Sequence, residues 1–156
     1  MWWRQTQREH NQNSGAVNKR KFKRLVASGA EPGIIAYSGD EPVGWCAVRP
    51  REEFGRFEKS RVLAPVDDQP VWSVTCLFIA KGHRQQGVST ALLKAAVKHV
   101  KKNRGKIVEG YPVDAHGKQP DAWVWTGIAS AYLAAGFKEV ERRSKTRPIM
   151  RYNLSK

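Results

Sequence analysis

The longest apolar run of the chain lies at its centre. Residues 71–80, VWSVTCLFIA, are almost all apolar and are rich in β-branched and aromatic side chains. That length and composition predict a strand covered on both faces. From Val88 to Val100 the apolar residues recur at spacings of three and four, which predicts an amphipathic helix. Four lysines fall on the opposite side of this helix, which we expect to face water: Lys94, Lys98, Lys101 and Lys102.

Shorter patterns predict the other elements. Before the central strand, a basic helix is expected at 17–28 and a hairpin with strands at 33–38 and 42–49, joined by Gly39-Asp40-Glu41. After the central helix, we expect a strand at 106–113, a helix at 126–135, and strands at 137–142 and 148–154.

Two segments carry no strong pattern. Residues 1–16 open with the apolar Met1-Trp2-Trp3, which we interpret as part of a first strand, and continue as a polar linker. Residues 50–70 form a long connection, and long connections in compact domains are often functional. A chain of 156 residues suits one domain. The element order predicts a single α/β (α+β) domain over residues 1–156, built around a mixed sheet.

A short basic turn with two glycines separates the central strand from its helix. The first N–H groups of a helix lack internal partners and carry partial positive charge. Gly87 lets the backbone approach a ligand closely, and Arg84 adds a full positive charge. Together these features suit a phosphate or pyrophosphate. An ordinary strand-to-helix loop with solvated basic residues explains the spacing equally well.

The residues of this turn, Arg84-Gln85-Gln86-Gly87-Val88-Ser89, resemble the acetyl-CoA pyrophosphate loop of the GNAT N-acetyltransferases, Arg/Gln-x-x-Gly-x-Gly/Ala. Ser89 is the one departure from that pattern. The segment from Tyr132 to Phe137 is similar to the family's Tyr-x-x-x-Gly-Phe, and the element order over residues 17–154 also agrees. The resemblance implies a mostly antiparallel twisted sheet with helices on both faces, and acetyl-CoA as cosubstrate.

The resemblance also implies a reaction. An acetyl group would pass directly from acetyl-CoA to a primary amine of a small molecule or peptide, in a ternary complex. Tyr132 would be the general acid, and the oxyanion donor would be a backbone N–H at Phe78 or Ile79. The cofactor-binding residues would be Leu77, Phe78, Ile79, Ala80, Arg84, Gln85, Gln86, Gly87, Val88, Ser89 and Thr90.

Glu109 is the candidate general base implied by the family's strand order, and Glu53 and Asp114 are weaker candidates. A strand glutamate paired with a lysine explains Glu109 at least as well. Cys76 has no recognisable histidine partner and is a poor nucleophile candidate. Aromatic side chains bind amines through cation–π contacts, although each one is equally typical of a core. The candidates for the acceptor pocket are Phe54, Tyr111, Trp123 and Trp125.

Charge and composition limit the alternatives. The net charge is +14, with basic clusters at 19–24 and 142–147. A solvated surface explains these clusters better than nucleic-acid binding, because the aromatic residues do not interleave with the basic ones. A non-catalytic CoA-binding domain and a basic RNA-associated protein are the competing functions. A homodimer is compatible with the family's sheet edge.

Several other classes of protein are not indicated. No run approaches the ~20 apolar residues of a membrane span, and the first residues lack a signal-peptide core, so we expect a cytoplasmic protein. No metal-ligand spacing is present. The two cysteines, Cys46 and Cys76, lie within apolar strand patterns and are expected to be buried free thiols.

Overall fold

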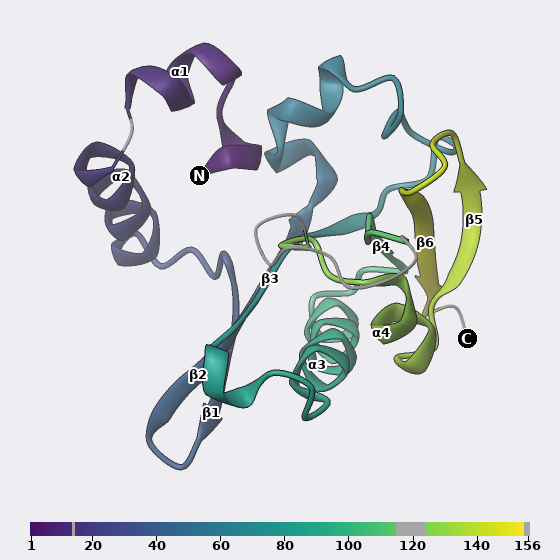
Figure 1. Cartoon of the computed structure of the whole chain (residues 1–156). Coiled ribbons are helices and arrows are strands. Elements are labelled where there is room, and N and C mark those ends of the chain that lie inside the picture. The colour runs from purple at the N-terminus through teal and green to yellow at the C-terminus, as the bar shows by residue number, and fades with distance from the viewer. Residues whose placement is uncertain (14, 115–123, 155–156) are drawn as a thin grey trace.

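The central apolar run forms β3 (Trp72–Ile79) in the middle of a six-stranded sheet. The computed structural model describes residues 1–13, 15–114 and 124–154 (Figure 1). Across the sheet the strand order is β1-β2-β3-β4-β6-β5. The other strands are β1 (Gly33–Ser38), β2 (Glu41–Pro50), β4 (Ile107–Gly110), β5 (Lys138–Arg142) and β6 (Pro148–Asn153). The fold class that the sequence predicts, a mostly antiparallel sheet with flanking helices, is confirmed.

Among the strands of the described residues, one neighbouring pair, β3 and β4, is parallel. Their register runs from the Trp72–Val108 pair to the Val74–Gly110 pair. Beyond Val74, β3 continues to Ile79 while β4 ends at Gly110. The sheet therefore opens between these two strands, and this opening positions the candidate site.

Helices cover both faces of the sheet (Figure 1). Helix α3 (Val88–Lys102) packs with α4 (Ala129–Ala134) on one face, where Cys46 of β2 joins the core. The neighbouring Trp45 points to the other face because side chains alternate along a strand. There its ring contacts the Phe22 ring of α2 (Ala16–Ala27) edge-on, with the two ring centroids 5.9 Å apart.

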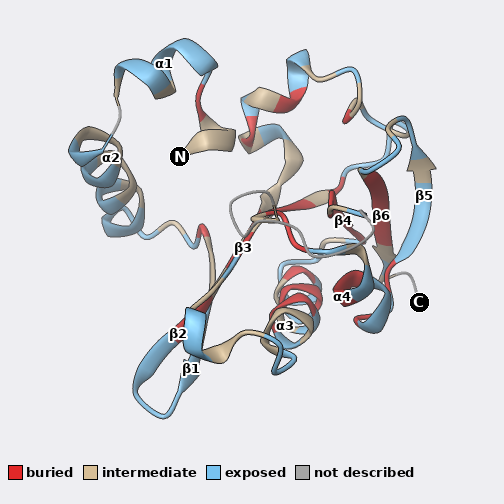
Figure 2. Cartoon of the chain, in the orientation of Figure 1, coloured by how far each residue is buried: buried red, intermediate tan, exposed pale blue. Residues whose placement is uncertain are grey.

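Each face of the sheet has its own apolar cluster. Met150 belongs to the core under α3 and α4, whereas its neighbour Ile149 belongs to a second cluster with Phe57 and Leu63. The segment between β2 and β3 covers this second cluster, and it contains two short 3₁₀ helices, η2 (Arg51–Glu53) and η3 (Gly55–Lys59). Figure 2 shows the buried residues on the inner sides of α3 and α4.

The structure corrects the prediction at the N-terminus. Residues 1–16 do not contain part of a strand, because Trp2–Arg4 form a 3₁₀ helix (η1) and Gln7–Gln12 form an α-helix (α1). Helix α1 begins with a capping box, in which the side chains of Thr6 and Glu9 bond each other's backbone N–H groups. The S/T-x-x-E spacing of this capping box was present in the sequence and indicates a helix start.

Two smaller differences concern the region of the site. The helix expected at 126–135 begins only at Ala129, because Gly127 adopts a left-handed φ of +88° that a helix cannot contain. A short 3₁₀ helix, η4 (Lys81–His83), precedes the basic turn. Both cysteines are free, as expected, but only Cys46 is buried, and Cys76 is half-buried. None of the helices in the described ranges combines the length and the apolar character needed to cross a membrane.

Candidate acetyl-CoA site and its surroundings

The turn before α3 presents backbone N–H groups without internal partners. Gln85 and Gly87 both adopt left-handed φ values, +59° and +77°, as in backbone turns whose amides converge on an anion. The first N–H group to bond within α3 is that of Ala91, which donates to the Gly87 carbonyl. The amides of residues 88–90 are therefore not used by the helix, and no side chain of Gly87 can cap them.

The turn opens onto a groove of about 660 Å³, which we call the β3–α3 groove. Its walls are the free end of β3, the turn with the start of α3, and the segments 113–114 and 124–130. The lining residues within those walls are 76–79, 83–85, 87–89, 113–114, 124–125 and 127–130. An extended phosphorylated ligand fits this arrangement, because a phosphate site lies at one end and a strand edge runs along the side.

The register of β3 shows which of its backbone amides face this groove. Leu77 donates its N–H to the Trp125 carbonyl at 2.8 Å, and Ala80 donates to Val43 of the β2 side at 2.9 Å. Because the direction of N–H groups alternates along a strand, Phe78 points to β2 with Ala80, and Ile79 points to the opening with Leu77. Of the two candidates for an oxyanion donor, the geometry therefore favours Ile79 over Phe78.

Most of the predicted cofactor-binding residues line the groove, and three do not. The side chain of Gln86 turns back to donate to the Gly82 carbonyl at 3.0 Å. Ala80 has its N–H engaged with β2, and Thr90 lies one residue beyond the lined part of α3. Arg84 lies at the mouth of the groove and donates from Nε to the Ile79 carbonyl at 3.1 Å, which ties the turn to the end of β3.

Tyr132, the predicted general acid, lies beneath the groove and not in its wall. The side chain is fully buried, and its hydroxyl donates to the Thr126 carbonyl at 3.1 Å. The ring fills the space beside Gly110 and Gly127, where an added Cβ would lie 2.1 Å and 2.9 Å from ring atoms. Burial raises the pKa of Tyr132 well above its usual value, so the phenol keeps its proton.

Glu109, the candidate general base, belongs to a buried ion network. Its side chain is 1% exposed, with Arg151 Nε 2.7 Å from one carboxylate oxygen and Arg51 Nη1 3.1 Å from the other. The Tyr111 hydroxyl also donates to Glu109 at 2.6 Å. Donors occupy both oxygens, and Glu109 does not line the β3–α3 groove, so the structure argues against its role as a base. Its partners are arginines and not the expected lysine.

The other carboxylates named as bases are also paired. Glu53 accepts from Arg49 at 2.6 Å and from Arg4 at 3.1 Å. Burial raises the pKa of Glu53, but the hydrogen bonds from Arg49 and Arg4 outweigh that effect and lower it overall. Asp114 does line the β3–α3 groove, where Arg142 lies 2.7 Å from it. Cys76 also lines this groove, and burial raises its pKa, which favours the unreactive thiol.

The predicted acceptor pocket is not assembled as expected. Phe54 and Tyr111 are 2% and 0% exposed and lie in the second apolar cluster, so they are core residues. Trp123 lies outside the described residues. Trp125 alone reaches the β3–α3 groove, and its ring contacts Trp2 and Trp3 at 6.4 Å and 5.6 Å between ring centroids.

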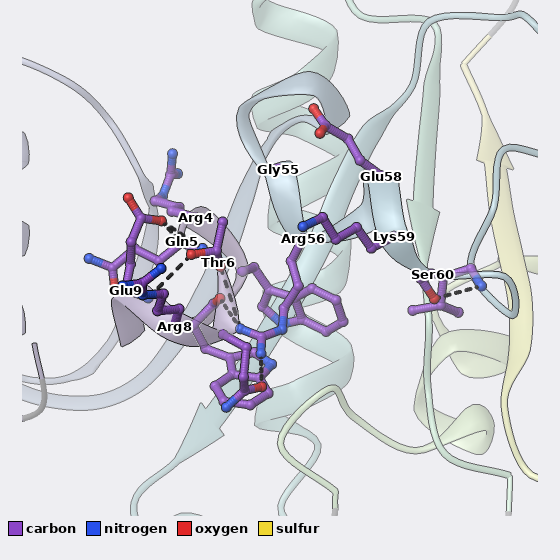
Figure 3. Close-up of a pocket in the computed structure, with 14 residues that line it drawn as sticks. Arg4, Gln5, Thr6, Arg8, Glu9, Gly55, Arg56, Glu58, Lys59 and Ser60 are labelled. Carbon is purple, nitrogen blue, oxygen red and sulfur yellow. Dashed lines mark hydrogen bonds between the residues drawn. The ribbon is translucent and has the colours of Figure 1, made fainter. Parts of the chain in front are cut away.

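Those two tryptophans lead to another groove, of about 870 Å³, which we call the N-terminal groove. Figure 3 shows residues 4–9 facing the residues around η3 across it. The Arg56 side chain crosses between the two walls, with its guanidinium over the Trp2 ring at 3.4 Å and a hydrogen bond to the Trp2 carbonyl at 3.1 Å. The lining residues are Trp2 to Glu9, Gly55, Arg56, Glu58, Lys59, Ser60 and Leu63.

The walls of the N-terminal groove contain polar atoms without partners among the described residues. Trp3 Nε1, a donor, and Gln5 Oε1, an acceptor, are both buried and make no hydrogen bond there. Glu58 is exposed and forms no ion pair within the described part of the chain. Sequence reasoning missed this groove because residues 1–12 were expected to form a strand and a linker.

The sequence and the fold were compared with known proteins. Residues 1–113 match the model of the acetyltransferase (GNAT) family, whereas no curated protein sequence matches the chain. The fold is similar to a ribosomal-protein-alanine N-acetyltransferase from Brucella melitensis, at 14% identity over 90% of this chain and 80% of that chain, with a TM-score of 0.56.

Two further solved structures show the same likeness. One is an acetyltransferase from Bacillus subtilis in complex with CoA, at 15% identity over 85% of this chain and 84% of that chain, with a TM-score of 0.50. The other is the ribosomal-protein-S18-alanine N-acetyltransferase from Escherichia coli, at 13% identity over 86% and 77%, with a TM-score of 0.53. At these identities the structures show a shared fold. Because the family model spans most of the sequence and the fold agrees, the chain belongs to the acetyltransferase (GNAT) family, whose cosubstrate is acetyl-CoA.

Proposed function

We propose that this protein is an N-acetyltransferase that transfers the acetyl group of acetyl-CoA to a primary amine. One observation carries the proposal: the turn with free amides before α3 and the open edge of β3 line a single groove. The turn and the amides of residues 88–90 would hold the pyrophosphate. The edge of β3 would hold the extended arm of the ligand, with its thioester near Ile79.

Acetyl transfer from a thioester needs few catalytic groups from the protein. Acetyl-CoA supplies an activated acyl group as a thioester. The Ile79 N–H faces the opening and would stabilise the charge that develops on the acyl oxygen, as a preorganised donor does. A thiol with a pKa of about 8.5 leaves readily as a thiolate, so the CoA thiolate needs little help from an acid. Tyr132 then serves as a positioning residue, because its hydroxyl holds the Thr126–Gly127 turn against Leu77.

The attacking amine must be neutral. Glu109 and Glu53 have their carboxylates engaged by arginines, and neither lines the β3–α3 groove or the N-terminal groove. An amine that titrates near about pH 8, as an α-amine does, is substantially neutral at that pH without a base on the enzyme. We therefore expect the rate to follow the ionisation of the acceptor itself.

We infer that the acceptor enters through the N-terminal groove. Its wall residues Trp2 and Trp3 contact Trp125, which lines the β3–α3 groove, so the two grooves meet at this tryptophan cluster. Glu58 would offer a local counter-charge to a protonated amine, in a lining that also contains cations: Arg4, Arg8, Arg56 and Lys59. Gln5 Oε1 would accept a hydrogen bond from an N–H group of the bound acceptor, since it has no partner among the described residues.

Calorimetric titration with acetyl-CoA tests the cosubstrate site. We expect binding to the parent and none to an Arg84→Ala, Gly87→Glu variant, because a carboxylate at Gly87 would repel the pyrophosphate. A well-folded parent that binds no acetyl-CoA would contradict the proposal. Binding by the parent without turnover in a screen of amines would instead favour a non-catalytic CoA-binding domain.

A second variant separates the acceptor path from the cosubstrate site. Glu58→Gln should leave acetyl-CoA binding unchanged and raise KM for a cationic amine by up to about fivefold, which corresponds to the loss of an exposed charge contact worth up to about 1 kcal/mol. Glu52→Gln, an exposed carboxylate of η2 outside both grooves, is the matched control. Equal KM values for both variants and the parent would refute entry through the N-terminal groove while leaving the acetyltransferase proposal intact.

A further inference from the structure

Helix α2 carries a dense cationic face. Within its bounds, Ala16–Ala27, it has five basic residues and no acidic one. At 100° per residue, Lys19, Arg20, Lys23 and Arg24 share the outer side, and all four are exposed. The larger apolar side chains, Phe22 and Leu25, lie on the inner side, where Phe22 contacts Trp45. Figure 2 shows α2 without any buried residue.

The positive charges of this face destabilise helix α2. Lys19 and Lys23 are spaced i,i+4, as are Arg20 and Arg24, and like charges at that spacing repel each other. The first turn of α2 has no acidic residue, and its N-cap, Gly15, has no side chain that could cap the free amides. None of the four outer cations pairs with a carboxylate in the described residues. The fold therefore retains uncompensated repulsion on one exposed surface.

The other basic segments of the protein have structural explanations. In the 142–147 cluster, Arg142 pairs with Glu139 and Asp114, and Arg143 donates to the carbonyls of residues 64 and 65. Arg147 donates to Thr126 and to the Tyr111 carbonyl. On α3, the basic residues of the last turn lie at the helix C-terminus, where the helix dipole favours cations. Of these three basic segments, α2 is the one whose outer cations, apart from Arg24 in its last turn, have neither a carboxylate partner nor such a position within the described residues.

We infer that the outer face of α2 is a docking surface for the phosphate backbone of a double-stranded nucleic acid. From Lys19 to Arg24 the helix axis rises by about 7.5 Å, and the four outer cations lie along that length, about one per 1.9 Å. The duplex carries one negative charge per about 1.7 Å of axis, so the two charge densities match. This surface is separate from both grooves and adds a binding activity to the proposed transferase.

The geometry favours a duplex over the other polyanions. Single strands bind to exposed aromatic side chains on which bases stack, but the one aromatic residue of α2, Phe22, faces the protein. Helices that lie on membranes insert an apolar face opposite their cations, whereas the inner face of α2 packs towards β2. Val26, at the edge of the cationic face, is the one large apolar residue of α2 that is exposed.

Salt-dependent binding measures the proposal directly. The probe is a fluorescently labelled DNA duplex of about 20 base pairs, and the test variant is Lys19→Gln, Arg20→Gln, Lys23→Gln, Arg24→Gln. Each phosphate contact contributes about 0.9 to the slope of log K against log salt. The variant should therefore lose about 3.6 from the slope. That corresponds to about a 150-fold smaller loss of affinity between about 50 and 200 mM salt.

A charge-matched control addresses non-specific attraction. Lys94→Gln, Lys98→Gln, Lys101→Gln, Lys102→Gln removes four exposed cations from α3 and should leave the slope within one contact of the parent. Equal losses from both variants would show attraction by net charge alone and would overturn the assignment to α2. An unchanged slope in the α2 variant would also overturn it, as would tighter binding of the parent to a single-stranded oligothymidine or to phosphatidylserine vesicles.

Folding of the variants does not obscure the result. Glutamine is a good helix former, and the substitutions remove like-charge repulsion, so thermal unfolding should be no earlier than in the parent. The smaller variant Lys23→Gln, Arg24→Gln provides a second point and should lose about half of the slope change, about 1.8. Acetyl-CoA titration of each variant should match the parent, which separates this surface from the proposed catalytic site.

Discussion

Replacing Glu109 with glutamine distinguishes a structural carboxylate from a catalytic one. Glu109 is buried between Arg51 and Arg151 and accepts a third hydrogen bond from Tyr111. Glutamine has the same shape but offers an NH₂ group in place of one carboxylate oxygen. That NH₂ group would face an arginine donor, and the two guanidinium groups would lose their shared counter-ion.

The expected loss of stability depends on the hydrogen bonds that Arg51 and Arg151 keep in the variant. Removing one partner of a buried ion pair costs about 3–5 kcal/mol. The lower end applies here because Arg151 keeps Asp67 at 2.6 Å, and Arg51 keeps the Leu63 carbonyl and the Tyr111 hydroxyl. We therefore expect Glu109→Gln to lower the free energy of unfolding by about 3 kcal/mol. For a domain of this size that lowers the melting temperature by roughly 6–12 °C.

Thermal and urea unfolding followed by circular dichroism measure this change, with Glu52→Gln as the exposed control. Turnover of the folded variant, at a temperature where it is fully native, should stay within about tenfold of the parent. Loss of a general base would instead reduce kcat by about 10²–10⁴. A variant as stable as the parent, with kcat reduced to that extent, would refute the structural role and restore Glu109 as the base.

Two further outcomes follow from the packing around Tyr132. Gly110→Ala should destabilise the protein by about 3 kcal/mol or abolish soluble expression, because the new Cβ would lie 2.1 Å from Tyr132 Cε1. Urea unfolding measures this loss. Gly55→Ala is the control, because a Cβ at Gly55 would have no atom within 4 Å. Stability should also fall as the pH rises above about 10, since burial raises the pKa of Tyr111 and Tyr132 while the unfolded chain releases both protons near about pH 10. The free energy of unfolding should then fall by about 1.4 kcal/mol per pH unit for each tyrosine, which urea unfolding over this pH range measures, and Tyr111→Phe should show a shallower decline.

The sequence predicted the elements whose patterns are long and regular. The central strand, α3 and the hairpin of β1 and β2 lie within a residue or two of their expected bounds. Apolar periodicity determines these elements because one face, or both, must be buried. The turn from Arg84 to Ser89 was also identifiable, since its glycine and its position before a helix have a local physical meaning.

Other features depend on contacts between segments that are distant in the sequence. Nothing near Glu109 indicates that Arg51 and Arg151 will enclose it, because those partners lie 58 and 42 residues away. Phe54 and Tyr111 were candidates for the acceptor pocket as well as for the core, and the covering segment after β2 places them in the core. The N-terminal groove requires residues 2–9 and η3 to meet, and no periodicity in either segment predicts that meeting.

The short register between β3 and β4 has a consequence for how the protein opens. In the described strands, this register joins β1, β2 and β3 to β4, β6 and β5 through the pairs from Trp72–Val108 to Val74–Gly110. Few backbone hydrogen bonds therefore couple the two halves of the sheet directly, and the shared core under α3 and α4 carries the rest of the coupling. A ligand that bridges the gap beside Leu77 would add to that coupling. We expect the amide hydrogens of β2 and β6 to exchange with different free energies of opening in the free protein, and with more similar ones in the ligand complex.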